Sequence, residues 1–233
     1  MTKVALIILN TFFISLVHAG ESSVYDFSWL DPDKEVYVLQ NRKYRKAKKV
    51  HFNVGYGFTT SGPFVNSVSL QGRVGVFLHE EWGVELLYSL NNGKENEVFH
   101  SVVNRGGPGS TPFRRIVKNY MGGMFIWSPF YAKINTFNFI VYLDWMFGIG
   151  LARLTEENNA RSLIAGGANI DPVATREAHS GLLWQTTFNV YLGQVTSLRI
   201  DFTAVHYKAT KPASTESEAY HNYDLTASLG VRF

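Results

Sequence analysis

Most of the chain after residue 50 alternates apolar and polar residues with a period of two. In the first such stretch, Val50, Phe52 and Val54 alternate with His51 and Asn53. Successive side chains of a β-strand point to opposite faces, so this pattern predicts strands and not helices. The same alternation marks residues 50–59, 68–78 (with one misfit, Phe77), 84–90, 139–152, 182–190, 198–205 and 223–233. A further segment, 116–127, predicts a strand of uncertain phase, because Met121-Gly122-Gly123-Met124 fits either face.

The expected links between these strands alternate in length. Short links are expected near 79–83, 128–137 and 193–196, and longer ones at 91–115, 155–178 and 206–220, with 61–66 the shortest of the second group. Short turns at one end and long loops at the other are typical of outer-membrane barrels. Strands of about 9–11 residues cross the hydrocarbon at a tilt. The sequence therefore predicts an all-β fold, an eight-stranded antiparallel transmembrane β-barrel.

Alternation by itself leaves open which face of the strands meets water. A soluble barrel of the lipocalin type turns its apolar face inward around a ligand. Here the polar face is rich in Gly, Ser, Thr and Asn with a few charges, which suits the narrow lumen of a small membrane barrel. Trp82 and Trp127 fall beside short turns, where interfacial aromatic residues are expected. These features favour the membrane barrel.

The composition excludes several kinds of chemistry. The 233 residues include no cysteine, which excludes disulfides, a thiol nucleophile and Cys-ligated metals. A net charge of +3 is too small to indicate a nucleic-acid binder. His51, His79, His100 and His221 are scattered without ligand-like spacing, so we expect no metal site and no other cofactor.

The first residues predict a cleaved secretory signal. Lys3 precedes an apolar run from Val4 to Val17, and Val17-His18-Ala19 places compact residues where a signal peptidase cleaves. The run is shorter than the roughly 20 residues that a membrane-spanning helix needs. We expect a signal peptide at 1–19, a periplasmic N-terminal extension at 20–49 and the barrel at 50–233.

The expected extension has two notable stretches. Residues 24–30 contain five large apolar side chains, which suggests docking on the barrel mouth, on a neighbouring subunit or on the membrane, with a collapsed tail without a fixed partner as the alternative. Of the nine residues 41–49, six are Lys or Arg. This basic stretch suits contact with anionic headgroups or cell-wall polymer, and equally suits a solvated linker.

The end of the chain resembles the last strand of Gram-negative outer-membrane proteins. In residues 223–233, the terminal Phe233 and the alternate apolar residues resemble the signal that the barrel assembly machinery reads. The barrel resembles that of outer membrane protein A, and we expect no peptidoglycan-binding domain after it, because the last strand ends at Phe233.

An ordered set of short motifs carries a second resemblance. The motifs are the residues 37–46, Ser61-Gly62-Pro63-Phe64, Ser128-Pro129 with Lys133, Asp144 followed by Gly148-Ile149-Gly150, and Ser197-Leu198-Arg199-Ile200-Asp201. Their order resembles an outer-membrane β-barrel domain family of delta-type proteobacteria, which include predatory and social bacteria. The resemblance implies the fold and an outer-membrane location. It implies no particular function, because members of that family are mostly uncharacterised.

The expected inward face carries charges of both signs: Arg73, Glu85, Asp144, Arg199, Asp201, Asp224 and Arg232, with Lys118 as an open case. They form either an ion path or active site, or a network of ion pairs that fills and stiffens the lumen. We favour the network, in which the three arginines pair with the four carboxylates, because eight strands leave little room for water.

A lipid-modifying enzyme is a further alternative. An acyl hydrolase would use a His-Ser pair at the membrane rim, and the candidates are His179-Ser180 and His206. None has a supporting carboxylate at a recognisable spacing, and a catalytic triad is defined by geometry. We therefore expect no enzymatic activity.

The expected function is a structural or interaction role in the cell envelope, with a narrow pore as the main alternative. Expected partners are outer-membrane lipids, the barrel assembly machinery and further copies of the chain. Small residues at outward positions (Gly72, Thr186, Ala204 and Ala227) allow close approach of two barrels. If the barrels associate, identical subunits would close into a ring, a homo-oligomer of cyclic symmetry. The alternative is that the small outward residues only reflect the curvature of the barrel.

The C-terminal strand provides the first test. Deleting Phe233, or replacing it with Asp, should leave unfolded protein in the periplasm, because the assembly signal is lost. Heat-modifiable migration on a gel measures folding. A folded band at normal yield for either variant would contradict the assignment.

Overall fold

A computed structural model describes residues 42–105, 112–136, 139–160, 175–211, 214 and 216–233 of the chain. The expected signal peptide at 1–19 and the aromatic stretch at 24–30 lie outside the described residues. The expectations for both therefore remain predictions. Residues 43–49, the end of the expected extension, are described and lie at the barrel mouth.

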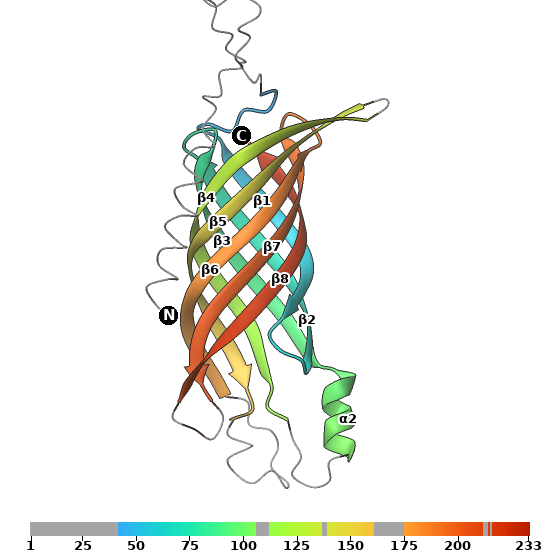
Figure 1. Cartoon of the computed structure of the whole chain (residues 1–233), viewed down its shortest axis with the longest axis vertical. Coiled ribbons are helices and arrows are strands. Elements are labelled where there is room, and N and C mark those ends of the chain that lie inside the picture. Colours follow the sequence, from blue (N-terminus) through green and yellow to red (C-terminus); the bar gives the residue numbers. More distant parts are fainter. Residues whose placement is uncertain (1–41, 106–111, 137–138, 161–174, 212–213, 215) are drawn as a thin grey trace, which may run out of the picture. The chain divides into compact units, whose positions relative to one another are not determined.

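Eight antiparallel strands form a closed barrel in which each strand pairs with its neighbours in sequence and β1 pairs with β8 (Figure 1). The strands are β1 (Val50–Thr60), β2 (Val65–Phe77), β3 (Trp82–Glu95), β4 (Arg115–Thr136), β5 (Phe139–Asn158), β6 (Thr175–Tyr191), β7 (Thr196–Thr210) and β8 (Ser217–Arg232). Every strand predicted from the alternation is present. The predicted fold class is confirmed.

The strands are longer than predicted, with 11 to 22 residues each. The short link expected at 128–137 is wrong, because β4 and β5 continue through it as a paired hairpin from Phe130↔Trp145 to Thr136↔Phe139. The two strands project together at the end where the chain terminates (Figure 1). A bulge between Trp127 and Phe130 precedes this extension and contains Pro129, which has no N–H to donate to a strand ladder.

The longer connections start from strand ends that lie opposite the C-terminus (Figure 1). One of them contains the helix α2 (Glu97–Arg105). Asn96 caps this helix, because its side-chain oxygen accepts a hydrogen bond from the Phe99 N–H at 3.0 Å. Phe99 is buried and meets the Phe64 ring edge-on. No helix in the described part of the chain is long and apolar enough to cross a membrane.

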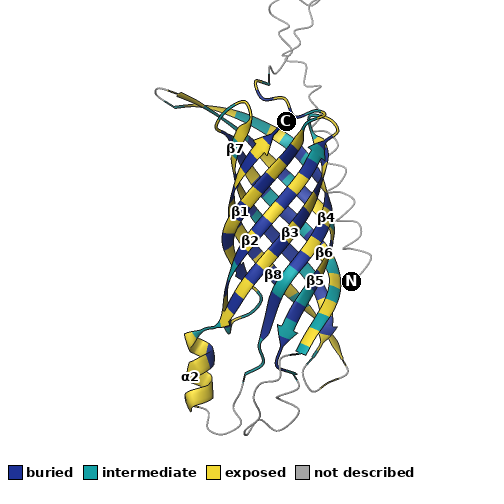
Figure 2. Cartoon of the chain, turned by 180° about the vertical axis from the view of Figure 1, so that it is seen from behind, coloured by how far each residue is buried: buried dark blue, intermediate teal, exposed yellow. Residues whose placement is uncertain are grey.

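The outside of the barrel is apolar, whereas the inside carries the charged and polar side chains together with a cluster of apolar ones. Figure 2 shows exposed and buried positions alternating along the strands. On β1, the outward Val54 and Phe58 are 64% and 69% exposed, whereas the inward Asn53 is 4% exposed. A wall of this kind is matched to lipid, since soluble monomers rarely expose large apolar patches. The lipocalin-type alternative, with its apolar face inward, is therefore excluded.

Aromatic side chains gather on the outer wall near the short turns. Trp82 and Trp127 are a directly opposed cross-strand pair, and their rings stack with centroids 5.7 Å apart. The contacts continue around the wall through Phe147, Trp145 and Phe188. Such a belt suits the boundary between hydrocarbon and headgroups.

Two glycines on opposite faces of the wall test these orientations. A Cβ on inward-facing Gly57 would lie 2.0 Å from the Leu225 backbone oxygen, whereas one on outward-facing Gly72 would meet nothing within 4 Å. We expect Gly57→Ala to lower the free energy of unfolding by about 1–3 kcal/mol. Gly72→Ala should raise the free energy of unfolding by up to about 1 kcal/mol, because alanine lowers the conformational entropy of the unfolded chain. Urea unfolding in detergent measures both, and equal effects would contradict the assigned faces.

Candidate functional site in the barrel lumen

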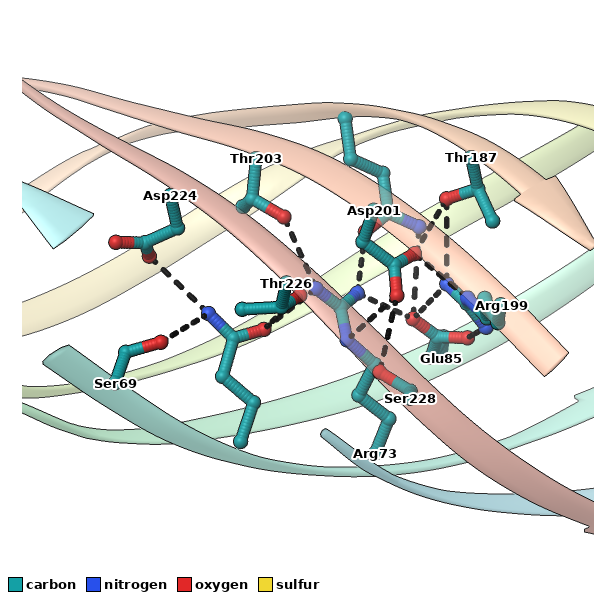
Figure 3. A network of polar contacts seen from close by, with 12 residues as sticks. Ser69, Arg73, Glu85, Thr187, Arg199, Asp201, Thr203, Asp224, Thr226 and Ser228 are labelled. Atoms are coloured by element: carbon teal, nitrogen blue, oxygen red, sulfur yellow. Dashed lines mark hydrogen bonds and ion pairs between the residues drawn. The ribbon is translucent and has the colours of Figure 1, made fainter. Parts of the chain in front are cut away.

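The centre of the lumen is organised around Glu85, a carboxylate on β3 (Figure 3). It accepts hydrogen bonds from Arg199 at 2.6 and 3.0 Å and from Arg73 at 3.0 Å. The Nε2 atom of His51 lies 2.9 Å from the same carboxylate. Glu85 is 2% exposed. A carboxylate taken so far from water is stable only when cations and donors surround it.

Asp201 on β7 is the second carboxylate of this network. Arg199 donates to it at 2.6 Å, the Thr187 hydroxyl at 2.6 Å, and Arg73 Nε lies 3.7 Å away. The network thus contains two arginines and two carboxylates, which balance in charge, drawn from strands β2, β3 and β7. Arg73 is held further by neutral acceptors: Gln185 at 2.5 Å, Gln71 at 2.7 Å and Thr203 at 3.0 Å.

Toward the loops, two more carboxylates lie in the lumen. Asp224 accepts hydrogen bonds from the Tyr120 hydroxyl and from Gln71 and Asn222, at 3.2 and 3.1 Å for the two amides. Its donors are neutral groups and not an arginine, contrary to the expected pairing. Glu156 lies within 3.3 Å of Arg115, and also accepts from the Tyr207 hydroxyl at 3.0 Å.

At the opposite end, the basic stretch before β1 enters the mouth of the barrel. The ammonium group of Lys46, 2% exposed, lies 3.0 Å from Asp144 and 2.5 Å from the Ser128 hydroxyl. The Tyr191 hydroxyl also donates to Asp144. Tyr44 stacks on the Tyr191 ring with centroids 4.6 Å apart. Neither contact with anionic polymer nor a solvated linker accounts for Lys46 and Tyr44, because both are buried.

Arg232 lies at this mouth and pairs with no carboxylate among the described residues, which corrects the expected pairing. Its guanidinium lies 4.7 Å from the centre of the Tyr191 ring and donates to the Gln194 carbonyl at 3.1 Å. Arg232 lacks a carboxylate partner because it is the last residue of β8, where the side chains around it are aromatic. Lys46 provides the cation for Asp144 instead.

Little empty space remains between the mouth and the central network. The cavity there has a volume of about 30 Å³ and is lined by residues of both, including Lys46, His51 and Arg199. A cavity of this size holds at most a few water molecules, since one water needs about 10–15 Å³. On the other side of the lumen, apolar residues from β3 to β7 fill the interior, among them Leu87, Ile126, Leu154, Leu183 and Val205.

Several lumen residues escaped the sequence analysis. Glu156 continues the inward positions of β5 beyond residue 152, so a longer predicted strand would have included it. Lys118 is the unpaired residue of a bulge between Val117 and Asn119, and Arg115 lies just before this bulge. The bulge shifts the alternation of inward and outward residues along β4. Lys118 lies near the loop end, outside the central network, where it is 31% exposed and 3.8 Å from Glu157.

The candidate hydrolase residues do not form a catalytic arrangement. His179 points inward and lies 3.3 Å from Glu156, whereas the next residue, Ser180, is exposed on the outer wall. His206 is on the outer wall, where Trp184 donates to its Nε2 at 2.7 Å and its Nδ1 faces Nδ1 of His221 at 2.6 Å. Both ring nitrogens of His206 are therefore occupied, and neither faces a serine.

One group in the described residues has the composition of a metal site. Glu156, Glu177 and His179 each bring a ligand atom within 4.8 Å of the others. The guanidinium of Arg115 already balances Glu156 at 3.3 Å, so the geometry is that of an ion-pair cluster. The expected absence of a metal site remains a prediction.

Comparisons with known proteins give structural likeness at low sequence identity. No family model and no curated protein sequence matches the chain. The solved N-terminal β-barrel domain of OprF from Pseudomonas aeruginosa is 12% identical, with a TM-score of 0.47, over 80% of this chain and 98% of that one. Neisserial surface protein A is also 12% identical, with a TM-score of 0.47, over 79% and 96%. Ail, the attachment invasion locus protein of Yersinia pestis, is 10% identical, with a TM-score of 0.41, over 80% and 99%.

The class of protein follows from the chain's own geometry, since these likenesses are too low to carry an argument. A closed ring of antiparallel strands, an apolar wall and a filled polar lumen define an eight-stranded β-barrel of the outer-membrane type. The specific resemblance to a family of delta-type proteobacteria remains a prediction.

The central network makes a stability prediction. Replacing Arg199 with Ala should lower the free energy of unfolding by about 3–5 kcal/mol, because Glu85 and Asp201 lose their shared cation while buried. The matched control is Arg176→Ala, since Arg176 is 75% exposed and only 3.6 Å from Glu157. Urea titration of the folded, heat-modifiable band measures both. Similar losses for the two variants would show that the network contributes little.

Proposed function

We propose that the protein is a non-catalytic barrel of the bacterial outer membrane whose lumen is closed and whose loop end makes contacts in the cell envelope. The observation that carries this proposal is the combination of an apolar outer wall with an interior filled by side chains. A wall of this kind needs a bilayer, and the expected signal peptide and C-terminal strand support delivery to the outer membrane by the assembly machinery.

The filled lumen argues against the pore. An ion would meet Tyr44 and Lys46 at the mouth, then the Arg73–Glu85–Arg199 network, and then Tyr120 with Asp224. Each layer is held by hydrogen bonds or ion pairs, and displacing a buried charge from its partner is costly. The barrel is therefore suited to stiffness and not to conduction.

The arrangement of histidines argues against a lipid-modifying enzyme. His179 and Ser180 lie on opposite faces of β6, and His206 is held by Trp184 and His221. A nucleophile and its base must lie within hydrogen-bond reach of each other. No such pair exists among these candidates.

The loop end supports an interaction role. The helix α2 is anchored there by Phe99, while its Val98, Val102 and Val103 side chains are 55%, 39% and 37% exposed. Exposed apolar side chains on a capped helix suit contact with another molecule. We therefore propose the loop end, with α2, as the surface through which the protein acts.

Self-association remains a prediction without added support. Of the small outward residues, Thr186 accepts a hydrogen bond from Trp145 and Ala204 is fully buried between Trp184 and Tyr223 on neighbouring strands. Those two positions are therefore covered by aromatic side chains of the same chain.

Planar bilayers test the closed lumen. We expect no steady current from the wild type. The variant Tyr44→Ala/Lys46→Ala should also stay silent, because the Arg73–Glu85–Arg199 network still closes the centre. Insertion is verified in parallel by the heat-modifiable band. Stable, ion-selective openings of the wild type would support the pore alternative instead.

A further inference from the structure

An arginine stands on the outer wall near the loop end. Arg153 occupies an outward, exposed position of β5, directly opposite Met121 on β4 and Ser180 on β6. The next outward residue toward the short turns is Leu151, which is 72% exposed. A cation here lies where the apolar band gives way to the headgroup region, since charges are tolerated on the outer wall only near its edges.

Arg153 has no ion pair within the described part of the chain. Two neighbouring cations do have a carboxylate partner, since Lys118 and Arg176 lie 3.8 and 3.6 Å from Glu157. The acidic residue at this rim is therefore shared by two other cations. Among the described residues the guanidinium of Arg153 therefore has no carboxylate partner, and it is available to an anion from outside them.

An apolar groove begins beside Arg153. It has a volume of about 590 Å³ and is lined by Arg153 and Ser180 at one end and by Met121, Gly123 and Leu151 beyond them. The groove is open along its length, as suits a chain that lies against the wall and is not enclosed by it. Polar donors at one end and an apolar channel at the other match an amphipathic ligand.

A second groove continues the first along the wall. It has a volume of about 580 Å³, shares Leu86 and Gly123 with the first, and is lined further by Val74, Val76 and Val84. These valines lie toward the short-turn end of β2 and β3. Gly123 is the shared floor, because it presents no side chain between Leu86 on β3 and Leu151 on β5.

We propose that Arg153 and these two grooves, termed the lipid groove, bind one lipid with a net anionic, phosphorylated headgroup. The phosphate receives hydrogen bonds from the Arg153 guanidinium and the Ser180 hydroxyl, and an acyl chain lies over Gly123. A guanidinium matches phosphate because its planar fork donates two parallel hydrogen bonds. The occupant is a lipid and not free phosphate, because the cation is continuous with an apolar channel. This proposal rests on the proposed membrane location. Because Arg153 lies near the loop end of the barrel, the bound lipid belongs to the outer leaflet.

Native mass spectrometry of the folded protein in mild detergent tests the lipid groove. The probes are lipid A, phosphatidylglycerol, zwitterionic phosphatidylcholine and inorganic phosphate. We expect one retained lipid A or phosphatidylglycerol per barrel, weaker retention of phosphatidylcholine and none of phosphate. Arg153→Gln should weaken lipid A binding by at least about tenfold, as expected for losing a charge-assisted hydrogen bond.

Matched variants separate the groove from general effects on the wall. Gly123→Leu should also weaken binding, because it fills the floor, and a Cβ there lies no closer than 3.4 Å to Leu86. Gly72→Leu places the same side chain on the outer wall where nothing lies within 4 Å. Arg176→Gln removes an outward arginine that is paired with Glu157. Both controls should bind lipid A as the wild type does.

Three results would overturn the proposal: equal retention of all lipids by the wild type, unchanged binding in both Arg153→Gln and Gly123→Leu, or a second protein chain in place of the lipid. The heat-modifiable band and insertion into vesicles are measured on the same samples. A barrel that inserts and does not select anionic lipid refutes the groove alone, whereas a barrel that does not insert refutes the proposed membrane function.

Discussion

Charge balance inside a narrow wall is the constraint on which the rest of this barrel depends. Glu85 and Asp201 are nearly inaccessible to water, and Arg73 and Arg199 provide both with cations. In such an interior, an ion pair is stable only when its remaining donors and acceptors are also satisfied. Gln71, Gln185 and the threonines of β6 and β7 do this for most of these groups. The neutral side chains thus join the charges in one central network, in which Nε of Arg73 is left without a hydrogen bond.

The same constraint accounts for the layers above and below the centre. Toward the loops, Asp224 is held by neutral donors and Glu156 by Arg115, while at the mouth Asp144 takes its cation from Lys46, which precedes the first strand. The charge of Asp144 on the barrel wall is therefore balanced by Lys46, from the segment that precedes the sheet. An apolar outer wall and an interior filled by side chains leave the loop end and the outer rim as the surfaces available for function.

The alternation of residues was sufficient to predict eight strands and the inward face that carries Arg73, Glu85 and Arg199, because a strand period of two is a local property. Phe77, the misfit in that pattern, points inward and packs over His51 and under Lys46. What escaped prediction depends on non-local contacts. Bulges in β4 reset the phase around Lys118 and Pro129, and the partner of Asp144 is Lys46, 98 positions earlier in the chain, a contact that no spacing rule supplies.

The connectivity of the central network has a consequence for how the barrel forms. Arg199 on the seventh strand neutralises Glu85 on the third, across a separation of 114 residues. Before β7 is in place, Glu85 has Arg73, His51 and the neutral Gln185 as partners from the earlier strands. Arg199 and Asp201 pair with each other on β7. Each half of the barrel therefore holds one arginine for each carboxylate, and the contacts between the two halves form only when the ring closes. Closure thus completes a buried polar network together with the strand pairing, which makes the assembly of this chain more cooperative.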